Sequence, residues 1–98
     1  IVYLNGRLDA TTSSGLTNEL SQMIANGDHK ILINFEKLEY ISSAGLRVLI
    51  TTVKLLKAKQ GKLILSNMSS GIFEVLRVSG FSKILNINET QEEALANF

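Results

Sequence analysis

Apolar residues along the chain alternate between two arrangements, compact runs typical of strands and a periodicity typical of helices. Four short runs rich in branched and aromatic residues predict strands. They cover residues 1–9, 30–36, 62–67 and 83–87. In the first run, only two residues follow Gly6 before the next break, which is too few for a returning hairpin strand. We therefore expect a bulge or kink at Gly6.

Between these runs, apolar side chains recur with the i, i+3, i+4 and i+7 spacing of one helix face. The predicted helices span residues 14–26, 44–60, 70–79 and 90–97. Gly27, Gly61 and Gly80 stand where the first three helices end, a position that favours glycine. Thr90 and Glu93 form a candidate capping box at the start of the last helix.

The regular alternation of strand and helix predicts the fold class. Repeated strand-helix-strand units imply right-handed crossovers and a largely parallel sheet. We expect one α/β domain over residues 1–98, with four or five strands and helices packed mainly on one face. The terminal helix is expected at an edge or end of the sheet. Since the chain starts at Ile1 without methionine, a short N-terminal strand missing from it is compatible with this expectation.

Composition narrows the possible functions. The 98 residues contain 45% hydrophobic residues and a net charge of +1, with both signs interspersed, which disfavours nucleic acid as the main partner. No membrane span is expected, because Lys54 and Lys57 interrupt the longest apolar stretch. The absence of cysteine excludes disulfides and thiol chemistry and fits a cytoplasmic location.

The motifs of ordinary catalysis are missing from the sequence. His29 is the single histidine and lies in a polar turn, far in sequence from any activated serine. No nucleotide-binding glycine motif occurs, and the chain has too few ligands for a zinc site. We therefore expect no enzyme, no cofactor and no metal.

The stretch "YISSAGLRVL", residues 40–49, is the most informative segment. A serine in front of a helix caps it by accepting a bond from a free backbone N–H, and one serine suffices for that. A phosphoserine at a helix start is also compatible with folding and adds about −1.5 to −2 charges to the surface. Ser42 and Ser43 can therefore be caps only, or one of them can be a switch.

Asp9 is expected to share the edge on which these serines lie. It follows the first strand, and Ser42 and Ser43 follow the second. In an open parallel sheet, ligands gather beyond the carboxyl ends of the strands. The sequence thus predicts a partner surface at this edge.

Two motifs together resemble the STAS domain, and in particular the bacterial anti-sigma factor antagonists. They are "NGRLDATTS" near the start and "LEYISSAGLRVLI" some way downstream, with "FSKILNI" near the end as a further similarity. The resemblance covers nearly the whole chain. It implies a transcription regulator that works by partner switching rather than by catalysis.

In that family, an anti-sigma factor that is itself a GHKL-type serine kinase phosphorylates the antagonist, and a PP2C-type phosphatase reverses this. The unphosphorylated antagonist binds the anti-sigma factor and releases the sigma factor. The family motif commonly reads Asp-Ser-Ser-Gly-Leu or Asp-Ser-Ala-Gly-Leu, with the first serine modified. The resemblance therefore implies Ser43 as the phosphoacceptor, Ser42 as second choice, and a partner surface made of Asp9, Ser42, Ser43, Gly45, Leu46 and Arg47.

The chain departs from the family pattern at two positions. Ser42 replaces the usual aspartate, which leaves two candidate acceptors and removes a negative charge that a kinase can recognise. Arg47 stands where a small residue is common, four residues after Ser43. Its guanidinium either reaches back to a phosphate on Ser43 or remains solvated.

A second function also fits the resemblance. Some STAS domains are reported to bind small nucleotides, and others are parts of signalling scaffolds without a sigma factor. Tight nucleotide binding by the isolated chain would favour that alternative.

Overall fold

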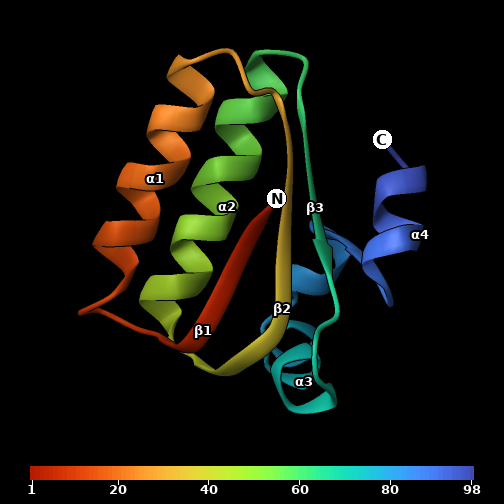
Figure 1. Ribbon diagram of the computed structural model, residues 1–98. Coiled ribbons are helices and arrows are strands. Elements are labelled where there is room, and N and C mark those ends of the chain that lie inside the picture. The colour runs from red at the N-terminus through yellow and green to blue at the C-terminus, as the bar shows by residue number, and fades with distance from the viewer.

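The fold is built on one parallel sheet. The structure is a computed structural model that describes residues 1–98. Its strands are β1 (Val2–Leu8), β2 (Lys30–Ile41), β3 (Lys62–Ser66) and β4 (Asn86–Asn88). They form a four-stranded sheet in the order β1-β2-β3-β4, and every neighbouring pair is parallel (Figure 1). The predicted α/β class with a largely parallel sheet is confirmed.

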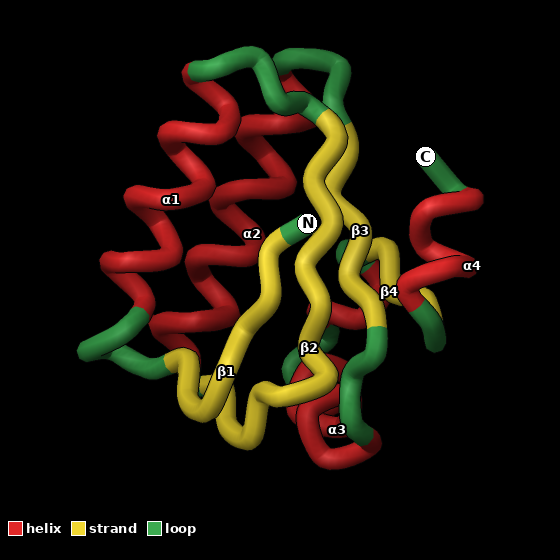
Figure 2. Tube along the Cα trace, in the orientation of Figure 1, coloured by secondary structure: helices red, strands yellow, loops and turns green.

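Helices make the connections between the strands (Figure 2). Three of them connect successive strands, namely α1 (Ser13–Ala25), α2 (Ser43–Ala58) and α3 (Ser70–Val78), the last followed by a short 3-10 helix at Phe81–Lys83. Helix α4 (Gln91–Ala96) follows the last strand. All four predicted helices are present, each within about two residues of its predicted ends.

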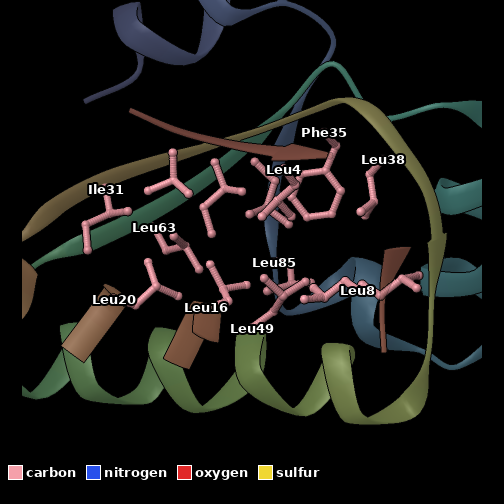
Figure 3. Packing of buried hydrophobic residues seen from close by; sticks show 14 of the residues in the cluster. Leu4, Leu8, Leu16, Leu20, Ile31, Phe35, Leu38, Leu49, Leu63 and Leu85 are labelled. Atoms are coloured by element: carbon pink, nitrogen blue, oxygen red, sulfur yellow. The ribbon is translucent and has the colours of Figure 1, made fainter. Parts of the chain in front are cut away.

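The main core lies between the sheet and helices α1, α2 and α3. Alternate residues of β2 point to opposite faces, so Ile33 and Phe35 face this core while Leu32 faces away. Figure 3 shows Phe35 from the sheet facing Leu16 and Leu49 from the helices. Three of the four helices thus pack on one face, as the sequence predicts.

The prediction that the terminal helix lies at an edge or end of the sheet is wrong. Helix α4 covers the opposite face, where Ala94 packs with Leu32 and Ile64 in a separate small cluster. Hydrogen bonds between side-chain amides hold both ends of α4 against the sheet. Gln91 accepts a bond of 2.9 Å from the buried Asn34 amide, and the Asn97 amide donates one of 2.6 Å to Asn88.

The sheet differs from the predicted strands at two places. Strand β2 continues to Ile41, well past residue 36, because it remains paired with β1 across two register shifts. One shift adjoins Gly6, whose φ of 68° fits the predicted bulge. The predicted strand 83–87 is instead the end of the 3-10 helix followed by the short strand Asn86–Asn88.

Gly61 is required for a different reason from the predicted helix cap. The residue in the left-handed region is Gln60, with φ of 59°, while Gly61 has no positive φ. A Cβ on Gly61 would collide with the backbone carbonyl of His29. The glycine therefore permits close approach of two chain segments rather than a left-handed turn.

Candidate functional site

The carboxyl ends of β1 and β2 bring the predicted site residues together. Leu8 pairs with Ile41 in the sheet, and the Ser42 amide donates a 2.9 Å hydrogen bond to the Leu8 carbonyl. Asp9 and Ser42, the next residue of each chain segment, are therefore neighbours. The ends of β1 and β2 lie together where α2 begins (Figure 1). The predicted placement of Asp9 on the serine edge is confirmed.

Ser42 is the residue that caps α2. It has extended backbone, and its side chain accepts a 3.4 Å hydrogen bond from the Gly45 amide. Its carbonyl accepts the first intrahelical bond, from Leu46 at 3.0 Å. The two serines therefore have different roles in the fold, and capping belongs to Ser42.

Ser43 is the first residue of the helix and is exposed. Its hydroxyl makes no hydrogen bond with the rest of the chain, so it has no evident structural duty. A free hydroxyl at an exposed helix start is accessible to a modifying enzyme. A phosphate there would meet the free N–H groups of the first turn.

Replacing each serine with alanine is expected to separate the two roles. Ser42→Ala removes the cap and should lower the free energy of unfolding by about 0.5–1 kcal/mol, since the bond is long. Ser43→Ala should change it by less than about 0.5 kcal/mol. Urea denaturation of both variants measures this, with Ser69→Ala as a control for loss of a cap at α3. A larger loss for Ser43→Ala than for Ser42→Ala would reverse the assignment.

Gly45 and Leu46 do not belong to the exposed surface. Leu46 is 5% exposed and packs in the main core, as its place on the inward face of the helix predicts, so it adds little to the accessible surface. Gly45 is buried against β1 and β2. A Cβ built on it would lie 2.8 Å from Leu8 Cγ and 2.9 Å from the Leu8 carbonyl oxygen. Both residues set how closely the first turn of α2 approaches the sheet.

Arg47 lies on the exposed side of α2, one turn after Ser43. It forms no ion pair within the chain, since the two ion pairs are Arg7–Asp9 and Glu74–Arg77. Its guanidinium is therefore free to meet an anion, and the i, i+4 spacing places it over the same face as Ser43.

Asp9 organises the turn between β1 and α1, a role that the sequence did not reveal. One carboxylate oxygen accepts from the Thr11 hydroxyl at 2.7 Å and from the Thr11 and Thr12 amides at 3.0 and 3.2 Å. The other accepts from the Arg7 side chain at 3.3 Å. These bonds, led by that from the Thr11 hydroxyl, lower the pKa of Asp9 from 3.8 to about 2.

The lowered pKa of Asp9 predicts a loss of stability in acid. Above pH 4 the carboxylate is charged in both folded and unfolded chains, and its stabilising contribution is fully present. As the pH falls from about 4 toward 2, the unfolded chain takes up the proton first, so this contribution is lost.

We expect Asp9→Ala to show a weaker loss of stability over that pH range than the parent chain. Urea denaturation at a series of pH values measures the slope, and Asp28→Ala, which removes an exposed loop carboxylate, is the control. Equal slopes for Asp9→Ala and the parent would contradict the role given to the Asp9 carboxylate.

Arg7 extends the polar surface beside this turn. Its guanidinium carbon lies 4.2 Å from the centroid of the Tyr40 ring, a cation–π contact between residues paired across β1 and β2. Both side chains are exposed. The sequence analysis missed this pair, because the bulges in β1 decide which residues of the two strands are opposite each other.

Comparison with known proteins identifies the family. The STAS domain model matches residues 1–94. The chain belongs to the STAS domain family. It is 34% identical over 98 residues to BtrV of Bordetella bronchiseptica, which is named as an anti-sigma factor antagonist, and covers 84% of that protein. It is 29% identical over 91 residues to the anti-sigma-B factor antagonist of Staphylococcus aureus; the match covers 93% of this chain and 84% of that one.

Solved structures agree with this STAS assignment. The anti-sigma factor antagonist SpoIIAA in its unphosphorylated form superposes with a TM-score of 0.76 at 26% identity, over 97% of this chain and 83% of that one. The phosphorylated form of SpoIIAA from Bacillus gives a TM-score of 0.73 at 29% identity, over 97% and 86% of the two chains. This STAS domain thus has the architecture of SpoIIAA, whose structure is known in both the unphosphorylated and the phosphorylated form.

The STAS domain also has a shallow groove between α1 and α2, of about 260 Å³, which Arg47 and several hydroxyl side chains line. No group of three or more histidine, cysteine, aspartate or glutamate side chains is arranged to hold a metal. None of its helices combines the length and the apolar character that crossing a bilayer requires.

Proposed function

We propose that this STAS domain is an anti-sigma factor antagonist switched by phosphorylation of Ser43. The unphosphorylated form binds a GHKL-type anti-sigma factor kinase in the cytoplasm and thereby releases a sigma factor. The kinase phosphorylates Ser43, and a PP2C-type phosphatase restores the hydroxyl. The observation that carries the proposal is that the two serines have different roles. Ser42 caps α2, whereas the side chain of Ser43 is exposed and its hydroxyl makes no hydrogen bond within the chain.

The position of Ser43 favours a switch that does not disturb the fold. The positive end of a helix dipole and its free N–H groups accommodate a phosphate at the first helical residue. The modification adds about −1.5 to −2 charges at the surface that the partner touches. Binding is therefore lost through the interface while the STAS domain remains folded.

Arg47 provides a second reason to place the acceptor at Ser43 rather than Ser42. It is exposed, lacks an internal partner and lies one helical turn from Ser43. In the unmodified chain it is available to the kinase surface. After modification, the Arg47 guanidinium can pair with the phosphate. The partner then loses a cation that it could bind, and it also faces the added negative charge of the phosphate.

The partner surface that we propose is smaller than the set expected from the sequence. Ser43 and Arg47 form its centre, and Asp9 and Ser42 adjoin them at the sheet edge. Gly45 and Leu46 support it from below, because both are buried. The similarity to relatives named as anti-sigma factor antagonists supports the same kind of partner.

Affinity purification from the source cell tests this function. The chain carrying Ser43→Ala, used as bait, should recover a GHKL-type kinase that mass spectrometry identifies, whereas Ser43→Asp should recover much less of it. Recovery of no such kinase by either bait, together with tight binding of a nucleotide by the isolated chain, would favour the small-nucleotide-binding alternative instead.

A further inference from the structure

A second hollow lies at the same carboxyl edge of the sheet, beyond β3 and β4 rather than β1 and β2. Its volume is about 860 Å³, against about 260 Å³ for the groove between α1 and α2. Its apolar lining consists of Met68, Phe73 and Ile87, and its charged lining of Glu89 and Glu93. It shares no residue with the proposed partner surface around Ser43. We refer to it as the acidic hollow.

The floor of the acidic hollow is apolar and incompletely covered. Phe73 lies on the flank of α3 beside the inward-facing Ile72 and remains 38% exposed, so part of its ring faces the hollow uncovered. Met68 and Ile87 are partly buried at the margin of the main core. An apolar side chain from outside would cover all three and remove their surface from water.

The charge of the acidic hollow has one sign. Glu89 and Glu93 are exposed, and no lysine, arginine or histidine lines the hollow. Arg77 is on the same helix as Phe73 but already pairs with Glu74. The two carboxylates thus give the lining of the hollow a negative charge, although the whole chain has a net charge of +1.

Two uncharged polar residues also line the hollow, Ser70 at the start of α3 and Asn88, and the Asn88 side chain is already hydrogen-bonded. Asn88 is 6% exposed, and its amide donates to Asn86 at 3.3 Å and accepts from Asn97 at 2.6 Å. It therefore has a structural role in holding α4. Recognition at the hollow depends on the apolar floor and the two carboxylates.

We propose that the acidic hollow docks a cationic amphipathic segment of a partner protein. The segment places an apolar side chain over Phe73, Met68 and Ile87, and a lysine or arginine against Glu89 and Glu93. Phosphate-bearing ligands are disfavoured by the same two carboxylates. This inference goes beyond the Ser43 switch, because the two surfaces use different residues and a docked segment leaves Ser43 free.

A titration with two synthetic peptides tests the proposal. Both have the same length and leucines at helical spacing, and they differ in having lysine or glutamate at every polar position. The ¹⁵N-labelled chain should show saturable chemical-shift changes at Phe73, Ile87 and Glu89 with the lysine peptide and none with the glutamate peptide. The effect should weaken as salt is raised, because both carboxylates are exposed.

Variants establish which residues bind the peptide. Phe73→Ala should weaken binding about tenfold, and Glu89→Gln about two- to fivefold. Adding Glu93→Gln should weaken it further, and Glu19→Gln on α1 is the matched control with no expected effect. Urea denaturation of each variant confirms that it folds.

Shifts centred on other elements, equal binding of the two peptides, or unchanged affinity in both Phe73→Ala and Glu89→Gln would each overturn the proposal. None of these outcomes bears on phosphorylation of Ser43, which is measured separately.

Discussion

Replacing Ser43 with aspartate is expected to weaken binding of the partner kinase by at least about tenfold, whereas Ser43→Ala keeps it. A tenfold loss corresponds to about 1.4 kcal/mol, and an unpaired charge in an interface costs several times that. The alanine variant removes only a hydroxyl that has no partner within the chain. The unmodified surface therefore tolerates a neutral side chain at this position but not a negative one.

Neither replacement is expected to unfold the domain. The Ser43 side chain makes no hydrogen bond within the chain, and a carboxylate in the first turn of a helix is favourable. Calorimetric titration with the purified kinase gives the affinities, and circular dichroism checks the fold. Gln22→Glu adds the same charge at an exposed position of α1, away from both proposed surfaces, and serves as the control. Equal affinities for Ser43→Ala and Ser43→Asp would contradict the electrostatic switch.

The second large effect is expected at Gly45, where an alanine should lower the free energy of unfolding by about 1–3 kcal/mol. The new methyl group would lie 2.8 Å from Leu8 Cγ, 2.9 Å from the Leu8 carbonyl oxygen and 3.0 Å from Ile41 Cγ1. The leucine side chain can rotate away, but the carbonyl oxygen is fixed by its 2.9 Å bond to the Ser42 amide. Helix α2 would have to move away from the sheet edge.

Gly71→Ala provides the control for Gly45→Ala. Gly71 also lies in the first turn of a helix, and a methyl group there meets no atom within 4 Å. We expect this variant to be neutral or to gain up to about 1 kcal/mol, since glycine in a helix is less favourable than alanine. Urea denaturation compares the two. A loss no greater for Gly45→Ala than for Gly71→Ala would contradict the close packing at Leu8.

Local patterns were sufficient to predict most of the fold. The helix spacing and the short apolar runs are properties of neighbouring residues, so the four helices, the parallel sheet and the bulge at Gly6 could be predicted. The position of α4 could not. That helix buries only Ala94, leaves Leu95 49% exposed, and is held by contacts such as Asn34–Gln91 between residues far apart in sequence.

The site was predicted in outline for a similar reason. Parallel pairing of β1 and β2 implies that Asp9 lies near Ser42, and the bond from the Ser42 amide to the Leu8 carbonyl agrees. The sequence could not decide which serine caps α2, because both precede the helix predicted over residues 44–60. By contrast, the burial of Leu46 follows from the helical spacing, since Leu46 lies on the same inward face as Leu49 and Leu56.

The most direct test of the central claim is a kinase assay with the cognate anti-sigma factor, read by phosphopeptide mapping. The account predicts phosphate on Ser43, none on Ser42, and no incorporation into Ser43→Ala. It also predicts that Ser42→Ala is still phosphorylated on Ser43. Any fall in the rate of phosphorylation should be no larger than the lower stability of that variant accounts for. Phosphate on Ser42 alone would contradict the assignment of the acceptor, and phosphate on neither serine would contradict the switch itself.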